Sequence, residues 1–452
     1  MQIKKLSPPL QIVIIFLGAI ITGTILLLIP ISRRVPISLI DALFTETSAV
    51  CVTGLIVKST ADDFTIIGQI IILISIQLGG LGIMTISTFF FQLLKKELSM
   101  RDHLVIKELV GTEDFSDIRR LIRNVVRYTM IFESFGAFFF ALKFVPEYGW
   151  IKGLWHSIFH SVSSFCNAGF STFNESFARF SGSPMVLVTS ALLIVFGGLG
   201  FLVLHEIFHI DLFTKKFKIS LKKLSLQSQF AVLGTLFFIL IGFLAFYLLE
   251  RENTLAHMNG KEKVLTSVYH SITARTAGFN VVDMSEVKTS TLILTEALMF
   301  VGACPGSTGG GIKITTFMIL VFILSAFIRQ KSSVITNRKT IPQLTLYKAM
   351  TIFLFSITLI FFAFMLLMHF NPILLWNKHQ DGSLRILFEI ISAFGTVGLS
   401  AGVTGELNFI GKSIIIIMMF LGRLSPTLIS LSIKKGDVQS QVIYPEERVL
   451  IG

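Results

Sequence analysis

The sequence is poor in charged residues. Of its 452 residues, 15% are charged, whereas soluble domains usually carry about 25%. A helix that spans a bilayer needs roughly 20 consecutive apolar residues. Long runs carry no charge at all, and three more segments carry only one or two. The charge-free runs are 11–32, 64–94, 180–204, 224–249 and 349–377, and the other three segments are 128–142, 289–328 and 413–433. The scarcity of charge excludes an ordinary soluble domain and predicts an integral membrane protein with eight spans.

Cysteine is equally scarce. The chain has three cysteines, Cys51, Cys166 and Cys304, all in or near apolar segments. An odd number of cysteines excludes a disulfide framework, and their wide spacing excludes a cysteine metal cluster. A cleaved signal peptide is also not expected, because the first apolar run is too long and no small-residue cleavage site follows it. We therefore interpret this run as the first span.

The positive charges are unevenly distributed. The net charge is +12, and three short loops hold 18 Lys and Arg in 66 residues, against 14 in 155 for the alternate loops. Cationic loops stay on the cytoplasmic side of a membrane. We therefore expect a cell-membrane protein with both termini in the cytoplasm, and no nucleic-acid partner. The basic loops are 95–127, 211–223 and 329–348, and the alternate loops are 33–63, 143–183, 250–289 and 370–412.

Each alternate loop holds a further apolar stretch of ten to fifteen residues, which is too short to span and suited to re-entering the membrane. These stretches end alike, in glycine followed by Leu or Phe: SAVCVTGL (48–55), SSFCNAGF (163–170), ITARTAGF (272–279) and SAFGTVGL (392–399). The glycines lie 115, 109 and 120 residues apart. Single Gly-Leu and Gly-Phe pairs are common, but all four of these occur at the same place, directly after a short apolar stretch between two spans. The pattern predicts an all-α fold of four repeats of span, re-entrant pore helix and span around one pore. The repeats are 1–94, 95–210, 211–328 and 329–452, and the third has a broken second span.

Four glycine strands around one axis predict a cation path. Non-helical backbone at membrane depth is tolerated only where it lines a water-filled path or is buried in protein. Rings of carbonyl oxygens can replace the hydration shell of a monovalent cation. Glycine supplies the positive φ that turns carbonyls inward, and each pore helix directs its partly negative carbonyl end toward the pore.

An acidic residue follows each glycine within eight positions. Ordinary solvated loop residues are one interpretation, and attraction of cations to an outer mouth is the other. The four residues are Asp62, Glu175, Asp283 and Glu406.

A glycine-rich stretch interrupts the sixth span. Residues 302–311 read GACPGSTGGG, and Ile312 and Lys313 follow. A phosphate-binding loop needs Lys directly after the last Gly and then a hydroxyl, so we expect no nucleotide site here. Unpaired backbone at this depth must face a cavity, and glycines allow two conformations. We predict a gate below the pore, with a permanently kinked, packed helix as the alternative. The predicted gate loop comprises Gly302, Ala303, Cys304, Pro305, Gly306, Ser307, Thr308, Gly309, Gly310 and Gly311.

Four charged residues fall inside the predicted membrane segments. They are Glu133, Glu296, Lys313 and Arg423. Intramembrane charges are costly and functional by default. For Arg423, an ion pair with either glutamate is one interpretation.

One short motif suggests a different class of protein. HEIFH (205–209) matches H-E-x-x-H, the zinc-binding pattern of metalloproteases. It lies at the end of the fourth span, no third ligand follows at a suitable spacing, and a protease would leave the glycine repeat unexplained. An enzyme is therefore not expected.

The stretch GTVGLS (395–400) is similar to the potassium-channel filter sequence TVGYG. With NAGF, RTAGFN, the glycine-rich interruption and GRLSP, the chain resembles the Trk/Ktr/HKT superfamily of potassium transporters over residues 10–450, and most closely the membrane subunit of Ktr systems. The resemblance implies a potassium selectivity filter, and Gly54 at the first glycine favours potassium over sodium. The implied filter residues are Val52, Thr53, Gly54, Asn167, Ala168, Gly169, Thr276, Ala277, Gly278, Thr396, Val397 and Gly398.

The resemblance also implies roles for residues outside the filter. Arg423 would contact the gate loop, with Lys313 beside it, and Arg275 would brace the filter. The chain itself would need no cofactor. Its partners would be a second copy of the chain and a cytosolic ring of nucleotide-binding (RCK) subunits. A tail such as 444–452 would form part of the dimer interface. Coupling to sodium or protons, as in a symporter, stays open.

Overall fold

The computed structural model describes residues 8–93, 118–209, 224–331, 333–336, 339–372 and 381–424. The tail at 444–452, Ser425 and Pro426 of the GRLSP motif and much of the basic loops lie outside the described residues.

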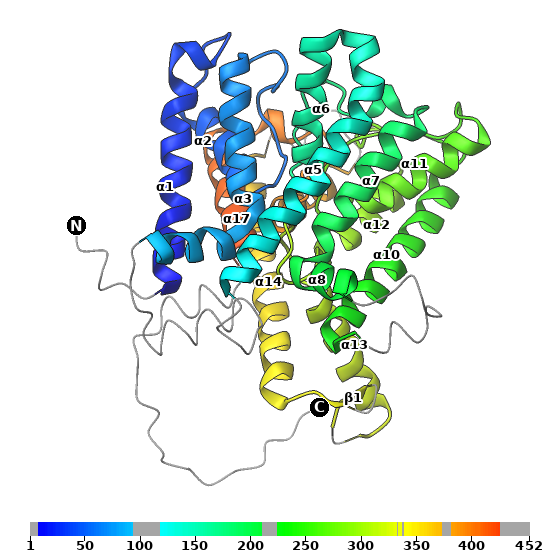
Figure 1. Ribbon diagram of the computed structural model, residues 1–452. Coiled ribbons are helices and arrows are strands. Elements are labelled where there is room, and N and C mark those ends of the chain that lie inside the picture. Colours follow the sequence, from blue (N-terminus) through cyan, green and yellow to red (C-terminus); the bar gives the residue numbers. More distant parts are fainter. Residues whose placement is uncertain are drawn as a thin grey trace.

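The described chain is built almost entirely of helices, which stand side by side with one small hairpin at the lower end (Figure 1). Strands β1 and β2 pair antiparallel, with Ile335 opposite Thr340. The first half contains α1 (Pro8–Leu28), η2 (Pro30–Ser32), α2 (Leu39–Val50), α3 (Ile66–Leu93), α5 (Ile118–Tyr148), α6 (Trp150–Phe165), η4 (Ala178–Phe180), α7 (Pro184–Leu199) and α8 (Phe201–His209). The second half contains α10 (Leu226–Glu250), α11 (Gly260–Thr273), α12 (Thr289–Phe300), α13 (Ile314–Ile328), β1 (Ile335–Thr336), β2 (Lys339–Thr340), α14 (Gln343–Phe370), α16 (Gly382–Gly395), η5 (Thr404–Glu406) and α17 (Phe409–Arg423).

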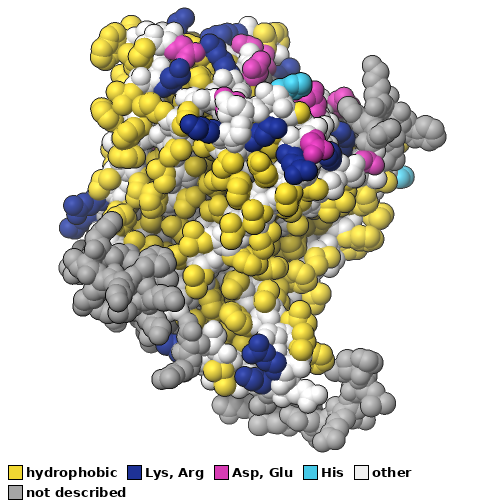
Figure 2. Space-filling view, turned by 90° about the vertical axis from the view of Figure 1, so that its right-hand side faces the viewer, with side chains coloured by type: hydrophobic (Ala, Val, Ile, Leu, Met, Phe, Trp, Pro, Cys, Tyr) yellow, Lys and Arg dark blue, Asp and Glu magenta, His cyan; other side chains and the backbone are white. Residues whose placement is uncertain are grey.

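Several helices match the apolar runs in the sequence. Figure 2 shows a broad band of hydrophobic side chains below an upper end where Lys, Arg, Asp and Glu gather, with a few Lys and Arg near the lower end. Among the described residues, four helices are long and apolar enough to cross a membrane: Leu10–Leu28, Arg123–Tyr148, Leu226–Glu250 and Gln343–Phe370. Three other apolar helices are shorter: Ile66–Leu81, Thr289–Phe300 and Ile314–Ile328. A mostly helical membrane protein is therefore confirmed, and the eight-span architecture stays a prediction.

The charge-free run at 180–204 does not form one straight helix. Its two parts, Pro184–Leu199 and Phe201–Phe208, are bent by 101°. Gly200 between them has a φ of +91°, a conformation that only glycine adopts easily. The carbonyl oxygens of Gly197 and Gly198 accept hydrogen bonds from residues 302–311 instead of from the next helical turn. The bend therefore depends on a contact distant in sequence.

Four short helices occupy equivalent places. Each of α2, α6, α11 and α16 packs against the long helix that precedes it, namely α1, α5, α10 and α14. The last three also pack against a helix of the preceding unit, so that α6 contacts α3, α11 contacts α7 and α16 contacts α12. The contact between α2 and α17 joins the two ends of the described chain. The short helices therefore follow one another around a closed circle.

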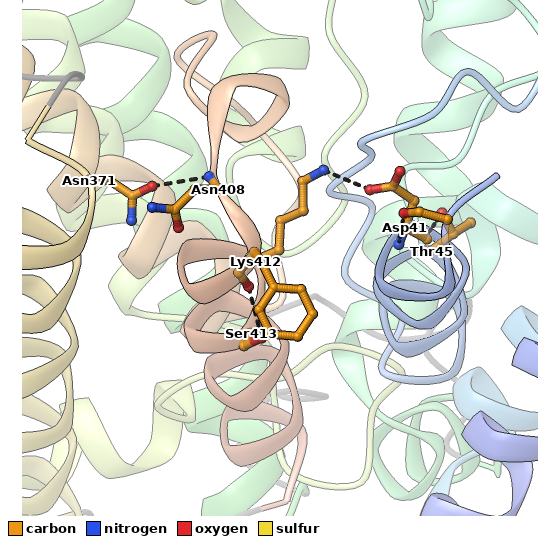
Figure 3. Close-up of polar contacts among 8 residues, drawn as sticks. Asp41, Thr45, Asn371, Asn408, Lys412 and Ser413 are labelled. Carbon is orange, nitrogen blue, oxygen red and sulfur yellow. Dashed lines mark hydrogen bonds and ion pairs between the residues drawn. The ribbon is translucent and has the colours of Figure 1, made fainter.

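An ion pair lies at the closure of this circle. Lys412 Nζ on α17 is 2.6 Å from Asp41 Oδ1 on α2, and the two side chains are 16% and 11% exposed (Figure 3). Beside it, the N–H of Asn408 donates to Asn371 Oδ1 over 3.0 Å. Burial alone would raise the pKa of Asp41, but the hydrogen bonds from Lys412 and Ser38 and the charges of Lys412 and Lys58 hold that pKa below its usual value. The pair is therefore ionised at neutral pH.

Replacing Lys412 with Met is expected to lower the thermal unfolding midpoint of the purified protein by a few degrees. The change leaves the Asp41 carboxylate partly buried without its cation, which costs more than the pair itself is worth. The double variant Asp41→Asn with Lys412→Met should recover part of the loss. A double variant whose loss equals the sum of the two single losses would show that the pair does not couple α2 to α17.

Candidate functional site

The four repeated glycines form a closed ring. All have positive φ: Gly54 +91°, Gly169 +69°, Gly278 +73° and Gly398 +94°. A Cβ atom added to any of them would collide with a carbonyl oxygen of the next strand. The colliding oxygens belong to Ala168, Ala277, Val397 and, closing the ring, Thr53. The strands therefore surround one axis in chain order, and their backbones approach too closely for any side chain at these positions.

A second strained position recurs two residues before each glycine. Val52, Asn167, Thr276 and Thr396 have φ of +56°, +59°, +75° and +50°. Left-handed backbone costs a residue other than glycine about 1–2 kcal/mol, and it persists only where the surrounding structure enforces it, commonly at functional sites. The residues between the two left-handed positions are Thr53, Ala168, Ala277 and Val397. The same backbone path therefore repeats in all four strands, although the side chains differ.

Hydroxyl groups at the ends of the short helices hold the strands. Ser48 Oγ accepts the N–H of Gly54 over 3.0 Å, and Ser392 Oγ accepts the N–H of Gly398 over 3.1 Å. In the other two strands the hydroxyl donates instead, to the carbonyl of the residue after the glycine: Ser163 to Phe170 over 2.7 Å and Thr273 to Phe279 over 3.0 Å. The motif comparison missed these residues. The signal was the serine at the start of three of the four aligned stretches.

A cavity of about 630 Å³ opens on one end of the ring. We call it the vestibule. All four glycines line it, together with residues that follow them in the chain. Of the predicted acidic residues, Asp62, Glu175 and Asp283 line the vestibule, and Asp62 accepts a hydrogen bond from Asn174 over 2.7 Å. Glu406 is not among the lining residues and is exposed on η5.

The loop between α12 and α13 lies at the other end of the ring. Residues 301–313 contain no helix, and a backbone bridge between Val301 and Ile312 brings the ends of the loop together. The N–H of Gly310 donates to Thr396 Oγ1 over 2.9 Å, and a Cβ atom on Gly309 would collide with Thr276 Oγ1. These contacts involve residues before the ring glycines, whereas the vestibule is lined by residues after them. The loop therefore lies across the ring from the vestibule.

The rest of the loop is bonded to the bend between α7 and α8. The N–H groups of Cys304 and Thr308 donate to Gly198 and Gly197 over 3.0 and 3.2 Å, and the N–H of Phe201 donates to Gly306 over 3.0 Å. Within the loop, Ser307 Oγ donates to the Cys304 carbonyl. The backbone groups that break the helix thus find partners in a second broken helix. This resolves how unpaired backbone is accommodated at this depth.

Two cationic side chains hold the loop. Arg423, only 8% exposed, donates to the carbonyl oxygens of Thr308 in the loop and Gly79 on α3. Lys313 Nζ donates to the carbonyl of Gly309 over 2.6 Å. These bonds go to carbonyl oxygens and not to a glutamate. Arg423 therefore joins α17, α3 and the loop.

The two intramembrane glutamates lie elsewhere. Glu133 on α5 approaches Cys166, with 3.9 Å between Oε1 and Sγ. Glu296 on α12 is 6% exposed, and its Oε1 has no hydrogen-bond partner among the described residues. Neither glutamate is among the residues that line the vestibule.

The remaining predicted residues lie close to the strands. Cys51 and Cys166 are buried, each as the cap of its short helix. Arg275, at the equivalent place in the third strand, is 7% exposed, and its Nη2 donates to Thr235 Oγ1 over 3.4 Å. This places its guanidinium behind the strand, against α10.

The HEIFH motif forms the second half of α8. Glu206 accepts the N–H of Ser225 over 3.0 Å, and His205 lies beside Asn124 and Tyr128. Within the part of the chain that the structure describes, which excludes the His209 side chain, no group of three metal-binding side chains gathers.

The fold and the site together define a helical membrane protein built around one ring of four glycine strands. The family of TrkH cation transport proteins matches residues 4–438, and the chain belongs to this family. It is 36% identical over 450 residues to Ktr system potassium uptake protein B of Bacillus subtilis, covering 99% of this chain and 97% of that protein. It is 37% identical over 454 residues to the potassium/sodium uptake protein NtpJ of Enterococcus hirae, covering 99% and 98%.

A solved structure shares the fold. The crystal structure of the potassium transporter TrkH from Vibrio parahaemolyticus matches with a TM-score of 0.73, at 17% identity, over 96% of this chain and 87% of that one. The resemblance inferred from the motifs is therefore confirmed. The relatives are transporters and not enzymes, so the metalloprotease interpretation of HEIFH is rejected.

Proposed function

We propose that this chain takes up potassium ions across the cell membrane as the translocating subunit of a Ktr-type system. The observation that carries the proposal is the ring of four positive-φ glycines, each in contact with a backbone carbonyl of the next strand. Membership of a cation transport family and similarity to two potassium uptake proteins support it.

In this proposal the ring is the selectivity filter. Carbonyl oxygens from the four strands replace the hydration shell of potassium as it leaves the vestibule. No charged side chain is needed in the ring, because the carbonyl dipoles and the carbonyl ends of four short helices supply the negative potential. Asp62, Glu175 and Asp283 raise the local concentration of cations in the vestibule.

The loop at 302–311 acts as the gate. It lies across the ring from the vestibule, and hydrogen bonds from Arg423 and Lys313 hold its backbone. Opening requires these bonds, and those to the bend between α7 and α8, to exchange partners. The gate therefore has a closed state with defined contacts, as a two-state switch requires.

The chain acts with partners in this account. The relative in Bacillus subtilis is named protein B of a Ktr system, and this name supports a partner for the present chain. We propose a homodimer on a cytosolic ring of nucleotide-binding subunits, with both termini in the cytoplasm and with any nucleotide bound by the ring. The chain itself carries only its transported ion.

Sodium- or proton-coupled symport is the second candidate, favoured by the similarity to NtpJ, which is named a potassium/sodium uptake protein. The two are separated by potassium flux into vesicles that contain the purified protein. We expect flux to follow the potassium gradient alone, because one ring with all four strands in the same orientation forms a continuous path. Flux that stops when the sodium and proton gradients are removed would contradict the channel-like mechanism and support symport.

A further inference from the structure

Two serines occupy the same position in opposite strands. Ser171 and Ser400 each follow a ring glycine by two residues, Gly169 and Gly398 respectively, and both line the vestibule. Each glycine of the ring contacts only the strands before and after its own, so these two glycines face each other across the axis. The two hydroxyl groups therefore lie on opposite walls just above the ring.

The Ser171 hydroxyl directs its hydrogen into the protein. Its oxygen is 2.9 Å from Nε2 of His160, whose Nδ1 is 2.8 Å from the carbonyl oxygen of His156. A carbonyl oxygen can only accept, so Nδ1 carries the hydrogen. His160 is fully buried, with its ring stacked on Phe173 at 4.6 Å, a setting that favours the neutral imidazole. Nε2 is then an acceptor, and Ser171 is the donor.

The Ser400 hydroxyl also directs its hydrogen into the protein, but its acceptor is a carboxylate and not an imidazole. Its oxygen is 2.6 Å from Oε1 of Glu389, which also accepts the N–H groups of Ala401 and Val403 over 3.1 and 3.3 Å. An oxygen that accepts two N–H groups carries no hydrogen of its own, so Ser400 is the donor. The other carboxylate oxygen accepts the hydroxyl of Thr404 over 2.6 Å. His160 and Glu389 both stand nine residues before the ring glycine of their strand.

Each serine oxygen is thereby an acceptor toward the vestibule. Besides donating, Ser171 Oγ accepts the N–H of Phe173 over 2.9 Å and Ser400 Oγ accepts the N–H of Gly402 over 3.1 Å. Thr404 Oγ1 also lies 3.2 Å from Ser400 Oγ, but its single hydrogen goes to Glu389 Oε2 over the shorter distance of 2.6 Å. A hydroxyl oxygen has two lone pairs, so each keeps acceptor capacity. The equivalent residue in the first strand is Ile56, which offers none.

We propose that Ser171 and Ser400 form an entry site for a hydrated monovalent cation, with His160 and Glu389 as positioning residues that fix the direction of the two hydroxyls. The proposal rests on the proposed function. Water bound to a cation points its hydrogens outward, so a hydrated ion is held by acceptors and repelled by O–H donors. The vestibule of about 630 Å³ has room for such an ion, because one water occupies about 30 Å³.

The test is the concentration dependence of potassium uptake by the full chain in vesicles. For the double variant Ser171→Ala with Ser400→Ala we expect KM to rise by about three- to tenfold, the usual effect of losing one or two hydrogen bonds, with the maximal rate and the potassium-to-sodium ratio unchanged. Ser171→Thr with Ser400→Thr keeps both hydroxyls and should stay near the native KM. Ser413→Ala is the control for losing a serine hydroxyl, because Ser413 is not among the residues that line the vestibule and its hydroxyl donates to the Phe409 carbonyl of its own helix over 2.8 Å.

The positioning role has its own readout. Glu389→Gln keeps an acceptor for Ser400 and should leave KM near the native value, whereas Glu389→Leu should raise KM as Ser400→Ala does, with no further rise when the two are combined. Because Glu389→Leu also leaves two backbone N–H groups without an acceptor, its thermal unfolding is compared with that of the native chain. If it does not fold, the contrast between Ser400→Ala and Ser400→Thr decides.

The outcomes separate this inference from the proposed function. A native chain that takes up no potassium would overturn the proposed function. Native uptake with an unchanged KM in the double alanine variant would overturn the entry site alone. Equal rises in KM for the alanine and threonine pairs would show that packing matters and not the hydroxyl groups, and would also overturn it.

Discussion

Replacing Gly54 or Gly398 with serine is expected to abolish growth of a potassium-uptake-deficient bacterium on limiting potassium, where the native chain supports growth. A Cβ atom on Gly54 would lie 2.6 Å from the Ala168 carbonyl oxygen, and one on Gly398 would collide with that of Thr53. Both glycines also have φ above +90°. The left-handed strain alone, about 1–2 kcal/mol per residue, corresponds to about tenfold in an equilibrium constant, and the clash adds to it.

The matched control is Gly405→Ser. Gly405 follows the fourth strand, is exposed, and has nothing within 4 Å of an added Cβ atom. This variant should support growth as the native chain does. Full growth with both ring variants, at native expression, would remove the assignment of the ring as the filter.

Replacing Arg423 with alanine is expected to raise potassium flux in the state where the native chain is closed. The change removes two hydrogen bonds from a buried guanidinium, one to Thr308 in the loop and one to Gly79 on α3. Hydrogen bonds to charged groups contribute about 1.5–3 kcal/mol each, so losing the bond to the loop favours opening by about tenfold or more. The measurement is rubidium uptake into vesicles with the purified chain and no regulatory partner.

Arg385→Ala provides the control for removing a buried arginine. Arg385 also joins two carbonyl oxygens, but these belong to Ala401 and Ser285 and not to the loop. Its removal should not increase flux in the closed state. An Arg423→Ala variant that folds and shows native closed-state flux would contradict the role of this arginine in holding the gate.

The sequence predicted those parts of the site where the backbone conformation or close packing admits only glycine. The ring positions admit only glycine, because each lies against a neighbouring carbonyl, so they recur as glycine at a regular spacing. The interruption at 302–311 was recognisable for the same reason, since a run of glycines cannot continue a helix cheaply. Of the four helices long enough to span, three followed from charge-free runs, and the fourth, Arg123–Tyr148, followed from the segment 128–142, which carries one charge.

The parts that could not be predicted depend on backbone groups, which look alike in every sequence. Val52, Asn167, Thr276 and Thr396 share a left-handed backbone but no side-chain type, so their equivalence was invisible. The residues alone offered Glu133 and Glu296 as partners for Arg423, and only the resemblance pointed to the loop, where the partner is the carbonyl oxygen of Thr308. The bend at Gly200 depends on hydrogen bonds from a loop about a hundred residues further along the chain.

The central claim is that ions cross through the glycine ring and are selected there. The most direct test compares potassium and sodium uptake by vesicles that contain only the purified chain, native or with Gly54→Ser. We predict a strong preference for potassium in the native chain and loss of that preference in whatever flux the variant retains. A native chain without preference, or a folded variant that keeps the native ratio, would contradict the claim.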